Sequence, residues 1–295
     1  MIKLSKILPF ILGIIFITSG ATKLISVDYF EQFLYSFGIL KLNYTIILTR
    51  LIIGLELTLG LLFLLRIFTK PLSYITLGLL FVFTVFIVFL ELSKSADDCY
   101  CFGTIIQLSN TVSIIKNIIL AGLVIFLLRT YSEPSKKFKR IKLVAAVALG
   151  FGLGFGIYFP DMLLGIKKEV TYCKPCFNDV IKSNELSDKK VMICFLSTKC
   201  KYCQLAAKKV NVISQKAGNS DKVLFVLWDN DHNPDKFFQE IHINHFQTKE
   251  MDMLKFLKLT NGKMPLLILF DKGNIKRTFR YKDIDEDAIL KFLKD

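Results

Sequence analysis

The chain has 295 residues, of which 53% are hydrophobic and 22% are charged. So large an apolar share excludes a single soluble domain, whereas so many charges exclude a protein that lies in a membrane throughout. The net charge of +14 does not indicate nucleic-acid binding, because no basic helix with interleaved aromatic side chains is present. We therefore expect a membrane part, residues 1–165, followed by a soluble part, residues 166–295.

Five apolar stretches are each about 20 residues long, the length that a helix needs to cross the hydrocarbon core of a bilayer. They cover residues 7–24, 46–65, 72–92, 112–128 and 143–164. After the first stretch, residues 29–34 form an amphipathic segment typical of a helix at the membrane surface. The sequence thus predicts an α-helical membrane bundle with a four-helix core and a fifth, tethering helix.

Cations are distributed unequally between the two ends of these spans. If the amino terminus is cytoplasmic, the inner ends collect Lys3, Lys6, Arg66, Lys70, Arg129, Lys136, Lys137, Lys139, Arg140 and Lys142. The outer connections hold Lys23, Lys41 and Lys94. This positive-inside pattern predicts a multi-pass protein of a bacterial-type cytoplasmic membrane, with its amino terminus inside and residues 166–295 in the periplasm.

The first span has an alternative interpretation as a cleaved signal peptide, since Lys3 and Lys6 precede an apolar run that ends in the small residues 19–21. Cleavage would leave four spans with the same orientation. The predicted location of the carboxy-terminal part therefore does not depend on this choice.

Cys99 and Cys101 lie on the outer side of the third span. A bridge between two cysteines one residue apart closes a small, strained ring. Strained and exposed disulfides are the labile ones that suit exchange. We expect a redox-active pair here, with a structural disulfide as the alternative.

Four ionisable residues lie within the predicted spans, at the midplane or in the outer half: Glu56, Arg50, Lys116 and Lys23. Charges at such depth usually face the bundle interior, where they pair or line a polar pathway. One hypothesis is that the cations favour a cysteine thiolate at position 99 or 101 and that Glu56 relays a proton. The alternative is a structural ion pair of Glu56 with one of the three cations.

Several segments of the membrane part resemble a known group of small membrane proteins. They are residues 13–20 with Lys23, residues 56–60, the Asp-Cys-Tyr-Cys-Phe-Gly segment 98–103, and Lys116 with Asn117. Residues 1–130 look like the DoxX and methylamine-utilisation MauE group. The resemblance implies a four-helix redox bundle for disulfide handling, akin to vitamin K epoxide reductase homologues, and quinone as a cofactor by analogy. Lys116 stands where this group suggests an arginine.

The soluble part contains a buried strand, 191–197, followed by Cys200-Lys201-Tyr202-Cys203 and a helix that extends to residue 215. A cysteine at a helix N-terminus has its thiolate stabilised by unpaired backbone N–H groups, and Lys199 and Lys201 add positive charge. The following elements are a strand at 223–228, a helix at 249–259, Met264-Pro265, strands at 266–270 and 275–281, and a helix at 285–293. This order resembles an α/β thioredoxin-like domain over residues 191–295.

The thioredoxin resemblance implies that Cys200 is the attacking thiolate, Cys203 the resolving thiol and Pro265 a cis-proline beside the substrate groove. Lys199 replaces the tryptophan usual in that family, and Cys194 occupies the position of its buried aspartate. We interpret Cys194 as a core residue. The histidines at 232, 242 and 245 lack metal-ligand spacing and are interpreted as surface residues.

Cys173 and Cys176 form a second Cys-x-x-Cys in the predicted linker 166–190, after a basic loop and fifth helix at 131–165. They are interpreted as a secondary redox pair in series with the other two pairs. A local structural disulfide is one alternative. A zinc site made with Cys200 and Cys203 is another, although a core strand separates the two motifs.

These features predict a membrane-anchored thiol-disulfide oxidoreductase that acts on cysteine-containing exported client proteins. The sequence requires no cofactor. Because no cysteine lies on the predicted cytoplasmic side, the oxidative direction is favoured. The alternative function is a non-catalytic maturation or assembly factor that binds exported clients.

Overall fold

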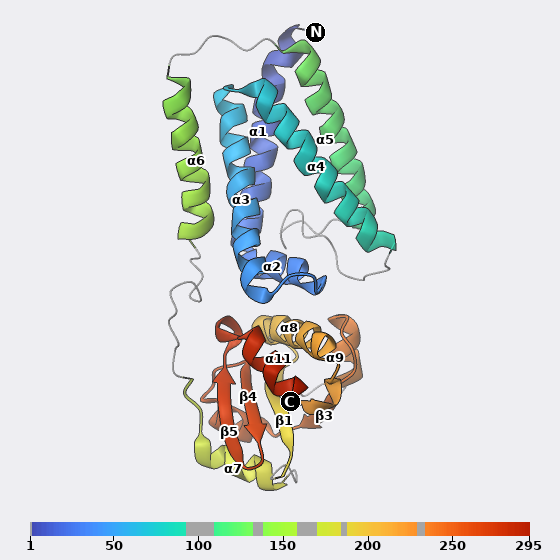
Figure 1. The fold of residues 1–295 in the computed structure, drawn as a ribbon, viewed down its shortest axis with the longest axis vertical. Coiled ribbons are helices and arrows are strands. Elements are labelled where there is room, and N and C mark those ends of the chain that lie inside the picture. Colours follow the sequence, from blue (N-terminus) through green and yellow to red (C-terminus); the bar gives the residue numbers. More distant parts are fainter. Residues whose placement is uncertain (1, 93–108, 132–137, 158–169, 184–187, 229–233) are drawn as a thin grey trace. The chain divides into compact units, whose positions relative to one another are not determined.

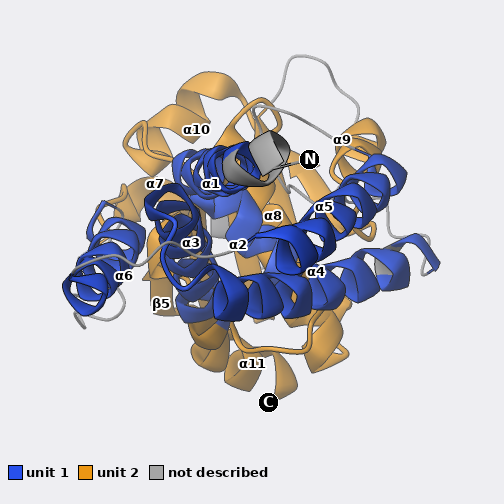
Figure 2. Cartoon of the chain, turned by 90° about the horizontal axis from the view of Figure 1, so that it is seen from above, with its two compact units in different colours: residues 1–34, 45–159 blue, residues 35–44, 160–295 orange. Residues whose placement is uncertain are grey.

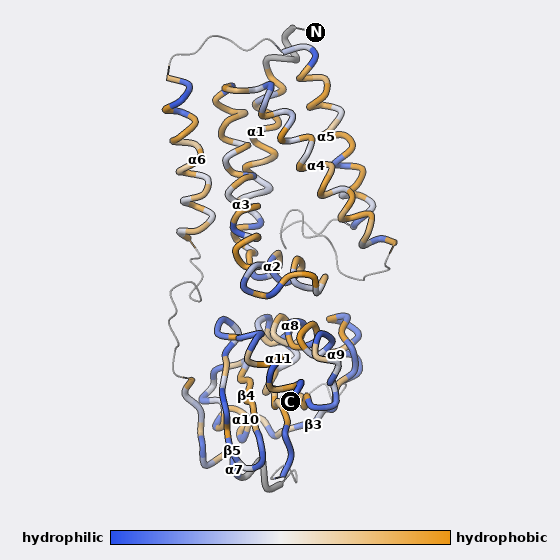
Figure 3. Tube along the Cα trace, viewed as in Figure 1, coloured by the Kyte–Doolittle hydropathy of each residue, from blue (hydrophilic) through white to orange (hydrophobic). Residues whose placement is uncertain are grey.

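A computed structural model describes residues 2–92, 109–131, 138–157, 170–183, 188–228 and 234–295. The chain divides into two compact units, residues 1–34 with 45–159 and residues 35–44 with 160–295 (Figure 2). The helices of the first unit are largely apolar along their length, whereas the second unit alternates polar and apolar residues (Figure 3). The expected order, apolar helices followed by a domain of sheet and helices, is confirmed.

The first unit is built of long helices (Figure 1). They are α1 (Ile2–Ile25), α3 (Leu42–Leu65), α4 (Thr69–Leu92), α5 (Asn110–Thr130) and α6 (Lys139–Gly156), and the short α2 (Val27–Ser36) follows α1. Four segments are long and apolar enough to cross a membrane, namely Ile7–Ile25, Leu42–Leu65, Thr69–Phe89 and Asn110–Thr130. They coincide with the first four predicted spans.

The fifth predicted span, 143–164, lies only partly within the described residues. Its described part belongs to α6, whose 18 residues include Lys139, Arg140 and Lys142 and so do not match the apolar character of the other four. α6 lies against α3. A Cβ atom at Gly150 would collide with the Thr58 hydroxyl and backbone, so this close helix contact requires glycine.

Several hydroxyl groups of the bundle are satisfied within their own helices. The hydroxyls of Thr49, Thr58, Ser73 and Thr76 each donate a hydrogen bond to the carbonyl oxygen four residues earlier in the same helix. Large apolar side chains such as Ile14, Phe81 and Ile118 point outward. Internal hydrogen bonding and an apolar outer surface are what a lipid environment requires of helices.

The second unit is built around a five-stranded sheet. Its strands are β1 (Lys190–Ser197), β2 (Val223–Trp228), β3 (Gln247–Glu250), β4 (Leu266–Asp271) and β5 (Asn274–Phe279), and its α-helices are α7 (Lys174–Ser183), α8 (Lys201–Ala217), α9 (Pro234–Glu240), α10 (Met253–Thr260) and α11 (Glu286–Lys294). The strand order is β3-β2-β1-β4-β5. β1, β2 and β3 are parallel, whereas β4 and β5 are antiparallel to their neighbours.

The central strand β1 is buried on both faces, as its continuous apolar sequence predicts. The face that carries Ile193 and Phe195 packs against Phe177 of α7 and Phe256 of α10. In the register, Phe195 pairs with Leu266 of β4, so the cis peptide bond between Met264 and Pro265 lies near the carboxyl end of β1. This is the end from which the chain enters the Cys-x-x-Cys motif.

The segment around residues 247–260 differs from the expected order. Residues 249–259 were expected to form one helix, but Lys249 and Glu250 belong to the edge strand β3, which pairs with β2. The helix α10 begins at Met253, after Asp252 accepts hydrogen bonds from the backbone N–H groups of the first turn. An aspartate at the N-cap position ends the strand and starts the helix.

Candidate functional site

Cys200 is held at the junction of a strand and a helix. β1 ends at Ser197, and Cys200 is the N-cap residue of α8, in an extended backbone conformation. Its Sγ accepts a hydrogen bond from the backbone N–H of Cys203 at 3.4 Å. The sulfur thus takes the place of the oxygen of an ordinary N-cap side chain and faces the positive end of the helix dipole.

The two thiols of this motif differ in their ionisation. Hydrogen bonds from the Cys203 thiol and from the backbone N–H groups of Cys203 and Tyr202 lower the pKa of Cys200 from 9.0 to about 6, against the opposing effect of its burial. Burial raises the pKa of Cys203, whose side chain is inaccessible to solvent. One sulfur is therefore an accessible thiolate at neutral pH and the other a protected thiol.

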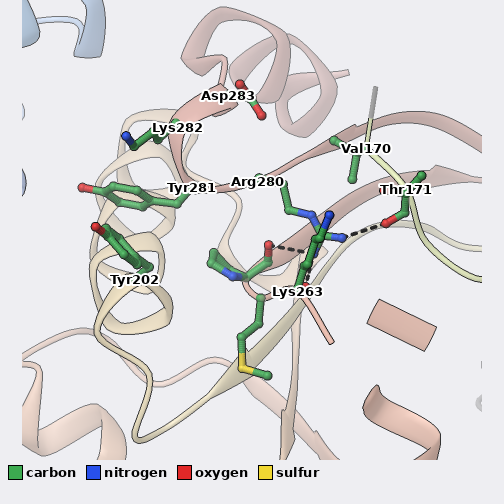
Figure 4. A pocket seen from close by; sticks show the side chains of 10 residues that line it. Val170, Thr171, Tyr202, Lys263, Arg280, Tyr281, Lys282 and Asp283 are labelled. Atoms are coloured by element: carbon green, nitrogen blue, oxygen red, sulfur yellow. Dashed lines mark hydrogen bonds between the residues drawn. The ribbon is translucent and has the colours of Figure 1, made fainter. Parts of the chain in front are cut away.

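A pocket of about 400 Å³ adjoins the motif (Figure 4). It is lined by Val170, Thr171, Tyr202, Lys263, Met264, Pro265, Arg280, Tyr281, Lys282 and Asp283. Tyr202, two residues after Cys200, packs against Tyr281 with ring centroids 5.1 Å apart. Pro265 and Met264, which the sequence placed beside a groove, do line this pocket.

Arg280 joins three segments around the pocket by its guanidinium group. It donates hydrogen bonds to the carbonyl oxygens of Lys263 and Pro265, at 3.2 Å for Pro265, and to those of Thr171 and Thr260 at 2.8 and 3.1 Å. Sequence reasoning missed this residue, because a lone arginine in a polar stretch carries no motif. Its contacts fix the loop that contains the cis-proline.

Cys173 and Cys176 form a disulfide at the start of α7. The backbone N–H of Cys173 donates to the carbonyl of Leu259 at 2.9 Å, and the adjacent Phe177 is wholly buried in the domain core. Part of the predicted linker is therefore integrated in the sheet domain. In the residues that the structure describes, no three histidine, cysteine or acidic side chains come together to hold a metal ion.

The remaining cysteines have separate positions. Cys194 is a wholly buried residue of β1, and burial raises the pKa of its thiol. This environment agrees with its interpretation as a core residue. Cys99 and Cys101 lie outside the described residues.

A polar cluster lies inside the helical unit. The Nζ atom of Lys23 in α1 is 2.6 and 2.8 Å from the carboxylate oxygens of Glu56 in α3. Ser19 joins the two groups, since its hydroxyl accepts from Lys23 at 2.9 Å and donates to Glu56 at 3.1 Å. Both charged side chains are almost fully buried. Of the three candidate partners of Glu56, the structure thus pairs it with Lys23.

A cavity of about 30 Å³ opens beside this cluster. Its polar lining is formed by Ser19, Lys23, Glu56, Lys116 and Asn117, and its apolar lining by Ile15, Phe16, Leu79, Leu80, Phe83 and Leu120. A polar cavity of this size can hold about one water molecule. Three of the four charged residues predicted from the sequence, Lys23, Glu56 and Lys116, therefore line the same cavity.

The fourth, Arg50, is buried in α3 about 1.7 turns from Glu56 and does not line the cavity. Ser19 and Asn117 were not singled out as site residues. Both lie in segments that carry the resemblance of residues 1–130 to a known family, but a neutral polar residue in an apolar helix does not by itself indicate a site.

The comparisons with known proteins concern the helical unit. Its first four long helices, with the paired Lys23 and Glu56, occupy the region that one protein-family model covers. Residues 1–130 match the family of methylamine utilisation protein MauE. This MauE region is a membrane-type domain, as its four apolar helices indicate. Searches among curated proteins and among solved structures each gave no match.

Proposed function

We propose that the chain is a membrane-anchored thiol-disulfide oxidoreductase. The observation that carries the proposal is the asymmetry of the Cys200-x-x-Cys203 motif: a thiolate with a pKa of about 6 beside a buried thiol. A reactive nucleophile and a protected resolving group on one helix turn are the two parts that disulfide exchange needs.

The fold of the sheet domain supports this assignment. We assign a thioredoxin-like fold to residues 191–295, on the basis of the strand order, the helix that starts at Cys200 and the cis-proline at the end of the neighbouring strand. In this assignment Cys200 attacks and Cys203 resolves. Pro265 borders the client groove.

The reaction in the oxidative direction starts from a Cys200–Cys203 disulfide. A client thiolate attacks the Cys200 sulfur, and Cys203 leaves as a thiolate and takes up a proton. The second client thiolate then attacks the client sulfur of the mixed disulfide, and Cys200 leaves as its stabilised thiolate. The client loses two electrons and forms a disulfide, and the domain holds the electrons as a dithiol.

The MauE region accepts these electrons in our proposal. In this proposal the domain dithiol would pass its two electrons to a disulfide of Cys99 and Cys101, and a quinone, when bound in the bundle, would serve as the final two-electron acceptor. Glu56, Lys23 and Lys116 around the polar cavity carry protons or stabilise charge at this step, and Arg50 contributes positive charge nearby. The Cys173–Cys176 pair is half-buried beside the wholly buried Phe177, and it fits a structural disulfide of the domain better than a relay step.

The experiment uses the full-length protein in lipid nanodiscs, oxidised beforehand, with a reduced secreted protein as client. Cys200→Ser is expected to lower the rate of client oxidation roughly 1,000-fold or more, because it removes the nucleophile. Cys194→Ala, which changes the buried cysteine of β1, serves as the matched control and keeps most of the rate. An unchanged rate in Cys200→Ser would refute the proposal. Retention of client binding without turnover in the wild type would favour the assembly-factor alternative.

A labelling experiment tests the location. In intact cells first treated with a mild reductant, which opens a Cys200–Cys203 disulfide, membrane-impermeant maleimide should modify Cys200 if residues 166–295 lie in the periplasm. In untreated cells, trapping the thiols with acid before labelling reports the redox state, and we expect the Cys200/Cys203 pair to be oxidised. Labelling that requires lysed cells would contradict the topology, and a persistently reduced pair would contradict the direction.

A further inference from the structure

The charges around the 400 Å³ pocket are predominantly positive. Its charged lining residues are Lys263, Arg280, Lys282 and Asp283. The guanidinium of Arg280 is engaged by backbone carbonyls and lies within electrostatic range of Asp283, the one acidic lining residue. The side chains of Lys263 and Lys282 remain exposed at the rim. The two ammonium groups are thus available to a bound molecule.

The cysteine motif adds cations beside this rim. Lys199 and Lys201 flank Cys200 in the chain, and both are exposed. Lys209 is buried, with its Nζ 4.3 Å from the centre of the Tyr281 ring. A concentration of one sign of charge around a pocket attracts a ligand segment of the opposite sign.

The rest of the pocket suits a peptide side chain. Tyr202 is 39% exposed and forms, with Tyr281, a wall on the Lys282 side of the pocket, opposite Val170 and Thr171 (Figure 4). Met264 and Pro265 supply further apolar surface. The pocket therefore combines an aromatic wall for an apolar side chain with ammonium groups placed for carboxylates.

We propose that this pocket selects clients whose cysteine lies in an acidic segment, with carboxylates that pair with Lys263 and Lys282. This inference rests on the proposed function, because it specifies the substrate class of the same thiol site. The lysines are solvent-exposed, so their effect is expected on the association rate and to weaken with salt.

The test compares three peptides with one intramolecular disulfide, identical except that Asp, Asn or Lys flanks the cysteines. The reduced full-length protein in nanodiscs reduces them: the Cys200 thiolate attacks a peptide sulfur, the peptide disulfide breaks, and Cys203 then releases the peptide as a dithiol while the domain disulfide forms. Each rate is divided by that with dithiothreitol, which removes differences in intrinsic reactivity. We expect the Asp peptide to react about tenfold faster than the Lys peptide at low salt.

Charge-reversed variants identify the source of the preference. Lys263→Glu with Lys282→Glu should abolish or invert it. Lys255→Glu with Lys291→Glu changes the net charge equally at exposed positions outside the pocket and should preserve it. An equal rate for all three peptides, or an equal loss in both double variants, would overturn the inference.

A binding measurement separates this inference from the proposed function. Fluorescent linear peptides with serine in place of cysteine report affinity by anisotropy without any thiol chemistry. Preferential binding of the Asp peptide, lost in the pocket variants, would support the inference even if no peptide is reduced. The absence of reduction would then count against the oxidoreductase proposal alone. Reduction of all peptides without charge preference in either assay would leave the oxidoreductase standing and refute the acidic client class.

Discussion

The helical unit and the sheet domain each hold an ionisable group inside the fold, but they hold it in different ways. Glu56 is nearly inaccessible, and its charge is compensated by Lys23 and by the Ser19 hydroxyl. Cys200 is half-buried, and its charge is stabilised by hydrogen bonds from its own helix turn. A carboxylate surrounded by apolar helices needs a counter-charge. A nucleophile must stay accessible to its substrate, so the thiolate is stabilised by hydrogen-bond donors of its own helix turn and not by a side chain that would cover it.

The largest effect is expected from breaking the ion pair of the helical unit. Glu56→Ala leaves the Lys23 ammonium buried without its carboxylate and should destabilise the bundle by about 3–5 kcal/mol. Loss of helical circular dichroism during thermal unfolding in detergent measures it. The double variant Lys23→Met with Glu56→Leu replaces the pair by apolar groups of similar size and should recover most of the stability. Wild-type stability of Glu56→Ala would show that the pair does not hold the helices together.

A smaller effect is expected at Arg280 in the sheet domain. Arg280→Ala leaves the carbonyls of the cis-proline loop without their donor and should destabilise this domain by about 2–3 kcal/mol. Trp228 is the only tryptophan of the chain and lies at the end of β2, so its fluorescence during denaturation reports the sheet domain alone.

Two further variants define the role of Arg280. Arg280→Lys should recover little, because one ammonium cannot satisfy carbonyls on several segments. Arg277→Ala in the neighbouring strand β5 removes a partly exposed ion pair with Asp285 and should change stability by less than about 1 kcal/mol. If Arg280→Ala raises the KM for a client while kcat is kept, the residue positions the groove. Equal losses from Arg277→Ala and Arg280→Ala would contradict that role.

The smallest effect is expected in the pH dependence of the reaction of Cys200 with an alkylating reagent. With a pKa of about 6, alkylation of the reduced protein by iodoacetamide should rise about tenfold per pH unit below pH 6 and level off above pH 7. Cys203→Ala removes the largest stabilising hydrogen bond and should move the midpoint upward. A midpoint near 9 in the wild type, the ordinary value, would contradict the assigned thiolate.

The lowered pKa of Cys200 also makes the stability of the reduced domain depend on pH. The folded state holds Cys200 with a pKa below its unfolded value of 9.0, so the unfolded state binds more protons between pH 6 and pH 9. The reduced domain should therefore gain stability as the pH rises through this window and lose it again as the pH falls toward 6. Denaturation followed by Trp228 fluorescence at pH 6 and pH 9 measures the difference, with Cys200→Ala as the control that removes it.

Much of the architecture could be predicted from the sequence because the signals are local. Twenty-residue apolar runs determine the four spans, and a buried strand followed by Cys200-x-x-Cys203 and a helical pattern determines the core of the sheet domain. The edge strand β3 could not be predicted, because its polar sequence Gln247–Glu250 becomes a strand only through pairing with β2. Tertiary pairing overrides weak local preference at such positions.

The site was predictable to a similar extent. Charged residues inside apolar spans are rare, so Glu56, Lys23 and Lys116 were visible in the sequence, but which cation pairs with Glu56 depends on the packing of α1 against α3. Arg280 was invisible, because its role consists of contacts to the main chain of distant residues. Every residue has a backbone carbonyl, so a side chain that binds carbonyls has no characteristic partner residue that a sequence could reveal.

The burial of Cys203 has a consequence for any covalent complex that the domain forms. Of the two sulfurs of the Cys200-x-x-Cys203 motif, only that of Cys200 is accessible to solvent. Every adduct trapped on this motif is therefore expected to be linked through Cys200. The lifetime of such an adduct is then set by an internal group a few ångströms away rather than by thiols in the surroundings. Mass spectrometry of adducts from a Cys203→Ala protein should accordingly yield one homogeneous cross-linked peptide, suitable for identifying natural clients.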